Sequence, residues 1–264
     1  MAVASNSLER ALLLLKAVEQ VPGGLRNAEI SRQLSIPKST CSYILRRLER
    51  EGYVIRDETT DRYRIGLATV ALAHGALREI GIRSVAEPAL YRLTSETGLS
   101  AGIGVLERGR VLLVDRVEGP SFISEAASGI RRYRNRDQRD IGRELPVHST
   151  ALGKVLLAFL PRPRAIEILA AHGLPRNTSK TIVSRARFLA ELEAVRKQGY
   201  AIADEETYLG LRSLSTPIFD SAGEVRAAVS VNGSPHDRIW NEMHELIRLM
   251  EAAGRDISRR ARFS

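Results

Sequence analysis

The stretch that most constrains the fold is residues 27–52, which read as two short helices joined by a tight turn. Asn27 is expected to cap the first helix, because its side-chain oxygen can accept an amide of the first turn. Ser35 and Ile36 form the predicted turn, and Pro37 suits the first position of the second helix, where its missing N–H costs nothing. In that second helix the apolar residues recur at helical spacing and form one inward stripe, made of Cys41, Ile44, Leu45 and Leu48.

The opposite face of this second helix carries hydroxyl, phenol and guanidinium groups, and no acid before Glu49. Such groups reach base edges and phosphates when a recognition helix enters the major groove. Ser39, Thr40 and Tyr43 are the candidates for base edges, and the cations are candidates for phosphates. An ordinary solvated helix face explains the same charges equally well, because short helix-turn-helix look-alikes are common. The DNA-binding candidates on this helix are Lys38, Ser39, Thr40, Ser42, Tyr43, Arg46 and Arg47.

A predicted β-hairpin follows the helix pair directly. Residues 53–56 and 62–65 read as strands, and the polar residues 57–61 between them read as a turn. A hairpin in this place is the wing of a winged helix-turn-helix domain. The wing would bring three further DNA-binding candidates, Arg56, Arg62 and Arg64, near a DNA backbone.

The N-terminal part of the chain resembles the DNA-binding domain of the IclR family of transcriptional regulators. The resemblance depends on runs of residues that share the family's pattern, namely Ser7-Leu8-Glu9-Arg10-Ala11, Leu34-Ser35-Ile36-Pro37-Lys38-Ser39-Thr40, Leu48-x3-Gly52-Tyr53-Val54 and Tyr63-Arg64-Ile65-Gly66. It implies double-stranded operator DNA as the partner, and a homodimer, with pairing of dimers left open. Half-sites would then lie about one helical turn, or a multiple of it, apart.

Composition agrees with a polyanionic partner without requiring one. The net charge is +9, from 40 lysines and arginines against 31 acids. Cys41 is the only cysteine, so no disulfide within the chain and no cysteine-based metal site is expected. No signal peptide is evident, and the apolar run at residues 11–15 is too short to cross a membrane. We therefore expect a cytoplasmic protein without a bound cofactor.

Residues 1–66 are predicted to form the winged helix-turn-helix domain. Its first helix is expected from Leu8 to about Gln20 with Ser7 as the cap, and its core side would carry Leu8, Leu12, Leu15 and Val18. Residues 67–81 read as a helix rich in alanine and leucine that needs another surface to cover its apolar side. The resemblance implies that this linker helix lies at a dimer interface.

Residues 82–264 read as an effector-binding domain of α+β class, an antiparallel sheet covered by flanking helices. The resemblance implies that this domain is GAF-like. Five arginines between Arg131 and Arg139 read as a solvated edge or loop, or alternatively as a site for an acidic effector. The expected helices are 85–97, 151–160, 164–172, 184–198 and 237–257, and the expected strands are 101–106, 111–117, 199–206, 210–219 and 225–232.

The run from Leu145 to Lys154 invites a phosphate-loop interpretation through Gly153-Lys154. The spacing excludes it, because His148 stands where the first glycine should be and Val155 where a magnesium-binding hydroxyl should be. What remains is a helix N-terminus preceded by Ser149 and Thr150, a place that suits a small anion.

The Leu145–Lys154 run and the region from Gly199 to Ser230 also resemble the effector domain of the IclR family. Characterised members respond to small molecules, often organic acids from aromatic or central carbon catabolism. Ser213 stands where the family often has cysteine, and Asn232 replaces a frequent serine, so a hydrogen bond to a carboxylate is retained. The effector-binding residues implied by the resemblance are Leu145, Ala151, Leu152, Ala203, Asp204, Leu211, Ser213, Ser230 and Asn232.

These features together predict a ligand-responsive DNA-binding transcriptional regulator, a repressor or an activator. A constitutive DNA-binding protein without ligand control is the main alternative. A small-molecule hydrolase is a further one, but His148, His172, His236 and His244 are scattered and no motif of a hydrolase or metalloenzyme occurs. No enzymatic activity is therefore expected.

Overall fold

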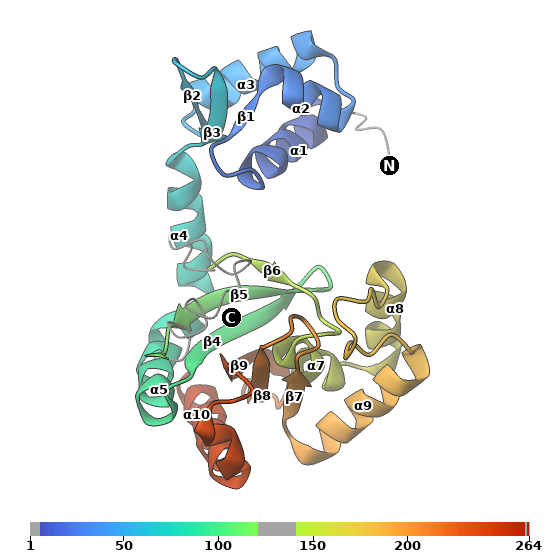
Figure 1. Ribbon diagram of the computed structural model, residues 1–264. Helices are drawn as coiled ribbons and strands as arrows, with labels where there is room; N and C mark the ends of the chain where they lie inside the picture. Colours follow the sequence, from blue (N-terminus) through green and yellow to red (C-terminus); the bar gives the residue numbers. More distant parts are fainter. Residues whose placement is uncertain (1–5, 121–140, 262, 264) are drawn as a thin grey trace. The chain divides into compact units, whose positions relative to one another are not determined.

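The computed structural model describes residues 6–120, 141–261 and 263. The expected arginine cluster between Arg131 and Arg139 lies outside the described residues. The chain divides into two compact units, Met1–Glu79 and Ile80–Ser264. Each unit is drawn with its element labels in Figure 1. No helix of the described residues is long and apolar enough to cross a membrane.

The first unit is a small helical core closed by a three-stranded antiparallel sheet of order β1-β3-β2 (Figure 1). Its core joins the inward sides of three helices to Val54 and Tyr63 of the hairpin. The hairpin register pairs Val54 with Ile65, so the predicted wing is present. The elements are α1 (Ser7–Glu19), β1 (Leu25–Arg26), α2 (Asn27–Leu34), α3 (Lys38–Arg50), β2 (Val54–Asp57), β3 (Arg62–Ile65) and α4 (Ala68–Ile80).

The two predicted helix caps are each wrong by one residue, since the N-caps are Asn6 and Arg26. The side chain of Asn6, and not Ser7, accepts the amide of Glu9 at 2.9 Å and caps α1. At α2 the Glu29 carboxylate accepts the backbone amide of Arg26 at 2.7 Å, while the side-chain amide of Asn27 donates to the Lys38 carbonyl at 3.3 Å. Local sequence allows several neighbouring polar residues to cap, and the direction in which the chain enters each helix decides among them.

The core side of α1 also differs from the prediction. Val18 is buried as predicted, together with Leu14 and Ala17, whereas Leu8 is 70% exposed and Leu12 is 53% exposed. Five apolar residues in a row satisfy more than one helical stripe, so periodicity alone does not select a face. Packing of α1 against α3 and β3 selects it.

The second unit is built on a six-stranded antiparallel sheet of order β6-β5-β4-β9-β8-β7. The predicted α+β class, with an antiparallel sheet and flanking helices, is confirmed. The elements are α5 (Ile82–Thr97), β4 (Ser100–Glu107), β5 (Arg110–Val117), β6 (Glu144–Leu145), α7 (Ala151–Ala158), α8 (Arg162–His172), α9 (Arg185–Gln198), β7 (Ala201–Asp204), β8 (Arg212–Phe219), β9 (Val225–Gly233), the 3-10 helix η2 (Arg238–Glu242) and α10 (Met243–Arg260).

Different helices cover the two faces of this sheet. On one face α10 packs against β8, where the Thr216 hydroxyl donates to the Met250 carbonyl at 3.0 Å. On the other face lies α7, in which every residue is buried. Side chains alternate along a strand, so the residues next to Thr216 face α7. The α7-facing side is the one that carries most of the expected effector residues.

Candidate DNA interface and effector site

The turn between α2 and α3 fixes how α3 is presented. Ser35 adopts the left-handed conformation with φ of 55°, and the Ser31 hydroxyl donates to the Ile36 carbonyl at 2.7 Å. Cys41, Ile44 and Leu45 then anchor the helix in the core, as predicted. Because these three residues define the inward stripe, the opposite stripe of α3 must face solvent.

The exposed stripe of α3 holds the cations and polar tips expected of a recognition helix. Lys38, Ser39, Tyr43, Arg46 and Arg47 are exposed, while Thr40 and Ser42 are partly buried. The Arg47 guanidinium carbon lies 4.8 Å from the centroid of the Tyr43 ring. Among the described residues, Lys38, Arg46 and Arg47 form no ion pair with an acid, so their charges face outward uncompensated.

The wing arginines differ from those of α3, because each has an acidic partner. Arg56 pairs with Asp61 at 2.7 Å, and Arg64 pairs with Asp57 at 3.5 Å. Amide donors at the tip of the wing, that of Thr60 first, hold the pKa of Asp57 below its usual value, so the acid stays charged. The wing is therefore close to neutral.

Arg62 is bound within the unit in a different way from the other two wing arginines. Its guanidinium donates to the Gly24 carbonyl at 2.7 Å and to Glu29 at 3.3 Å. The residue thereby ties the end of β3 next to the hairpin turn to Gly24, which precedes β1, and to α2. A strand pattern shows that Arg62 is on the hairpin, but only the packed unit shows where its side chain is directed.

In the second unit, the strand register brings three expected effector residues into one row. Ala203 lies opposite Ser213, and Ser213 lies opposite Asn232 on the next strand. Residues directly opposite in antiparallel strands share a face, which here is the α7-facing side. Within the described residues, the side chains of Ser213 and Asn232 have no hydrogen-bond partner, so both are available to a ligand.

Asp204 departs from the expected set. It lies opposite Arg212, one position further along each strand, so its side chain points to the other face of the sheet. There Arg212 donates to Asp204 at 2.8 Å, and its guanidinium carbon lies 5.7 Å from the centroid of the Trp240 ring. The hydrogen bond from Arg212 holds the pKa of Asp204 below its usual value. The resemblance to a family motif did not separate the two faces of the strand.

Ser230, another of the expected effector residues, is 4% exposed. Its hydroxyl lies 3.5 Å from the Gly102 carbonyl on β4. Leu145 lies on β6 opposite Val111 and is partly buried in the core beside α7. Leu211 belongs to the loop before β8, where its carbonyl accepts the amide of Glu205 at 2.8 Å. The expected effector residues thus do not form a single surface.

The N-terminus of α7 is the place for which the sequence predicted an anion site. Thr150 caps the helix by accepting the amide of Gly153 at 3.1 Å. The amides of Ala151 and Leu152 lie in the first turn, where a helix has no acceptor for them. The side chains of both residues are buried. Gly153 is required for packing, because a Cβ there would lie 2.3 Å from the Val147 carbonyl oxygen.

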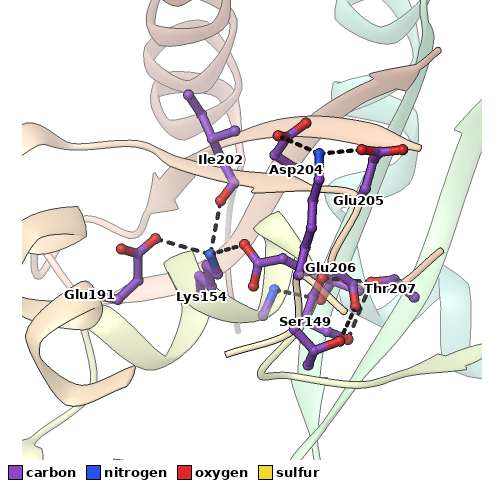
Figure 2. A network of polar contacts seen from close by, with 12 residues as sticks. Ser149, Lys154, Glu191, Ile202, Asp204, Glu205, Glu206 and Thr207 are labelled. Carbon is purple, nitrogen blue, oxygen red and sulfur yellow. Dashed lines mark hydrogen bonds and ion pairs between the residues drawn. The ribbon is translucent and has the colours of Figure 1, made fainter. Parts of the chain in front are cut away.

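Lys154 is the residue that sequence reasoning missed. Its side chain is 1% exposed, and Figure 2 shows its ammonium group between Glu191, Glu206 and the Ile202 carbonyl. The Nζ atom lies 3.0 Å from Glu191, 2.5 Å from Glu206 and 3.0 Å from the carbonyl oxygen. A single lysine inside an otherwise apolar helix was the available signal, since a buried lysine needs partners.

Two family models match this chain. The IclR helix-turn-helix domain matches residues 7–58, and the bacterial transcriptional regulator IclR C-terminal domain matches residues 74–259. The chain belongs to the IclR family. It is a ligand-responsive DNA-binding transcriptional regulator and not an enzyme.

Relatives along nearly the whole chain agree with this assignment. The HTH-type transcriptional regulator XynR of Escherichia coli K12 is 31% identical over 227 residues, which are 86% of this chain and 85% of XynR. The crystal structure of the Thermotoga maritima IclR matches with a TM-score of 0.71 and 27% identity, over 97% of this chain and 98% of that one. Over a shorter part of the chain, a double mutant of the inducer-binding domain of PobR from Acinetobacter, solved with 3-hydroxybenzoic acid, matches with a TM-score of 0.57 and 28% identity, over 67% of this chain and 98% of that domain.

Proposed function

We propose that residues 1–66 read operator DNA through α3. Ser39, Thr40, Ser42 and Tyr43 contact base edges, and Lys38, Arg46 and Arg47 contact phosphates. The observation that supports this division is the uncompensated positive stripe of α3 beside a wing whose arginines are paired. Arg56 and Arg64 reach the backbone only by exchanging their acidic partners for phosphates, and Arg62 acts within the unit.

The same proposal makes the protein a homodimer in the cytoplasm, with residues 67–81 as its linker helix and residues 82–264 as its effector-binding domain. Large apolar side chains are exposed in the first unit, on α1 at Leu8 and Leu12 and at Leu67, Val70 and Leu72. Such exposed apolar side chains would be covered if these helices met a second copy of the chain. A dimer would present two copies of α3 to half-sites about one helical turn, or a multiple, apart. Pairing of two dimers would extend the same arrangement.

The effector in this proposal is a small organic acid. The free amides of Ala151 and Leu152, at the positive end of α7, suit its carboxylate. Ser213 and Asn232 supply neutral donors and acceptors for the rest of the molecule. The 3-hydroxybenzoic acid held by the PobR domain is an acid of this class and supports the assignment.

Thermal unfolding of the full-length protein against a panel of aromatic, keto and sugar acids tests the effector. A compound that binds only the folded state stabilises it by about 2.7 kcal/mol at one hundred times its dissociation constant. Operator binding is then measured with and without each acid that raises Tm. Unchanged operator affinity with every acid would favour a constitutive DNA-binding protein.

A further inference from the structure

Lys154 uses all of its hydrogen-bonding capacity inside the second unit. An ammonium group has three donors, and here they reach Glu191 on α9, the Ile202 carbonyl on β7 and Glu206 just after β7. The second carboxylate oxygen of Glu206 is buried and has no partner within the described parts of the chain. Glu206 therefore depends on Lys154 for the compensation of its charge (Figure 2).

This ion set joins the two segments that flank the proposed effector position. The α7 entry segment, residues 149–153, contains the amides of Ala151 and Leu152. The post-β7 segment, residues 205–211, contains Leu211 and leads directly to Ser213. A second link reinforces the first, because the Thr207 hydroxyl donates to the Ser149 carbonyl at 2.6 Å.

The post-β7 segment has a strained backbone conformation, which contacts with neighbouring segments must stabilise. The backbone of Glu205 has a φ of 55°, a value that residues other than glycine rarely adopt. The loop is closed by the amide of Glu205 on the Leu211 carbonyl and by the amide of Gly210 on the Glu205 carboxylate, at 2.8 and 2.7 Å. Two residues of this loop, Glu206 and Thr207, are the ones tied to the region of α7.

A buried ion set is poorly explained by stability alone. Replacing such a set by packed apolar side chains is often neutral or stabilising, while directional contacts of the charged set specify one register. Lys154 has one acceptor on α9, one on β7 and one in the post-β7 segment, which is an arrangement that specifies register.

We infer that Lys154 is a positioning residue for effector binding, an inference that rests on the proposed function. Through Glu206 and the Ile202 carbonyl, it holds the α7 entry segment and the post-β7 segment at one separation. The amides of Ala151 and Leu152 and the side chain of Ser213 can then contact the same ligand.

Hydrogen exchange of the full-length protein without any effector, followed by mass spectrometry, tests this inference. In Lys154→Met the amides of both segments should exchange at least about tenfold faster, while those of β4 and β9 keep their wild-type rates. Unchanged exchange in both segments, or a uniform rise through the whole unit, would overturn it. Because no effector is present, this result is independent of whether the panel of acids identifies one.

Two further variants separate positioning from folding. Lys180→Met is the matched control, because Lys180 also pairs with two acids, Asp204 and Glu205, but its side chain is 46% exposed. Exposed pairs contribute little, so both segments should keep wild-type exchange. The double variant Lys154→Met with Glu206→Leu removes both charges of this buried pair and should keep Tm near that of the wild type, yet exchange faster in both segments. Wild-type exchange in the double variant would show that any packed pair suffices and would refute the inference.

Discussion

The substitution Arg47→Ala tests whether α3 neutralises phosphates. Three cations on α3, Lys38, Arg46 and Arg47, have no acidic partner among the described residues, and the three arginines of the hairpin are paired. If two copies of α3 bind one operator, about six phosphates are neutralised. The slope of log K against log salt concentration is about −0.9 for each neutralised phosphate, so a slope of about −5 is expected.

Arg47→Ala removes one cation from each copy and should reduce the magnitude of that slope by nearly two units, about 0.9 for each copy. Between about 50 and 200 mM salt, the factor by which operator affinity falls should be about ten times smaller for the variant than for the wild type. The measurement is fluorescence anisotropy of a labelled operator, titrated at several potassium chloride concentrations. The affinity should fall by a similar factor on operator variants, since a phosphate contact carries no sequence information.

Arg62→Ala is the matched control for this experiment. Arg62 donates to Gly24 and Glu29 within the unit, so its loss should lower Tm and leave the salt slope unchanged. An unchanged slope in Arg47→Ala would refute the phosphate role of α3. Equal slope changes in both variants would refute the distinction between the unpaired cations of α3 and the paired Arg62 of the wing.

Three further outcomes are expected. Ser213→Ala should weaken the Tm shift caused by an acid from the panel, because a ligand-facing hydroxyl is lost, whereas operator affinity without that acid should stay unchanged. Gly153→Ala should lower the free energy of unfolding by about 1–3 kcal/mol in urea titrations, because its Cβ would overlap the Val147 carbonyl. In Asp220→Asn the free energy of unfolding should fall less steeply as the pH is lowered below about 4. Arg226 and neighbouring amides hold the pKa of Asp220 below its ordinary 3.8, so the carboxylate stabilises the folded state above that pH and loses this effect as pH falls through the lower value.

Each of these outcomes has a result that would contradict it. Asp204→Asn is the control for Ser213→Ala, since Asp204 lies on the other face of the sheet and its loss should leave the acid-induced Tm shift in place. Equal loss of the shift in both variants would contradict the assignment of faces. Wild-type stability in Gly153→Ala would show that the approach to Val147 can relax. An unaltered stability profile below about pH 4 in Asp220→Asn would remove that carboxylate from the acid response.

Local sequence patterns predicted the buried residues correctly where the apolar residues of one helix form a single stripe. Cys41, Ile44 and Leu45 recur at helical spacing with no competing stripe, and they are buried as predicted. The α1 helix shows the opposite case, because its run of apolar residues allows several faces. Leu8 and Leu12 were assigned to the core and are exposed. Their apolar surface is part of what supports a dimer.

The effector region shows why a family motif is less precise than a sheet register. Asp204 and Ser213 belong to the same pair of strands, but alternation directs them to opposite faces. A linear motif contains both residues without distinguishing the faces. The α7 N-terminus, by contrast, could be placed from sequence because capping by Thr150 is a local interaction.

The sequence by itself determined the family, the winged helix pair, the α+β class and the helix N-terminus suited to an anion, since each depends on local spacing or on a motif along the chain. Only the tertiary structure decided the partners of the charged side chains. Arg62 joins Glu29, Asp204 joins Arg212, and Lys154 joins Glu191 and Glu206. These partners lie far apart in sequence, except for Asp204 and Arg212. The free energy of a charge depends on its burial and on the atoms that surround it, and only folding brings those atoms together.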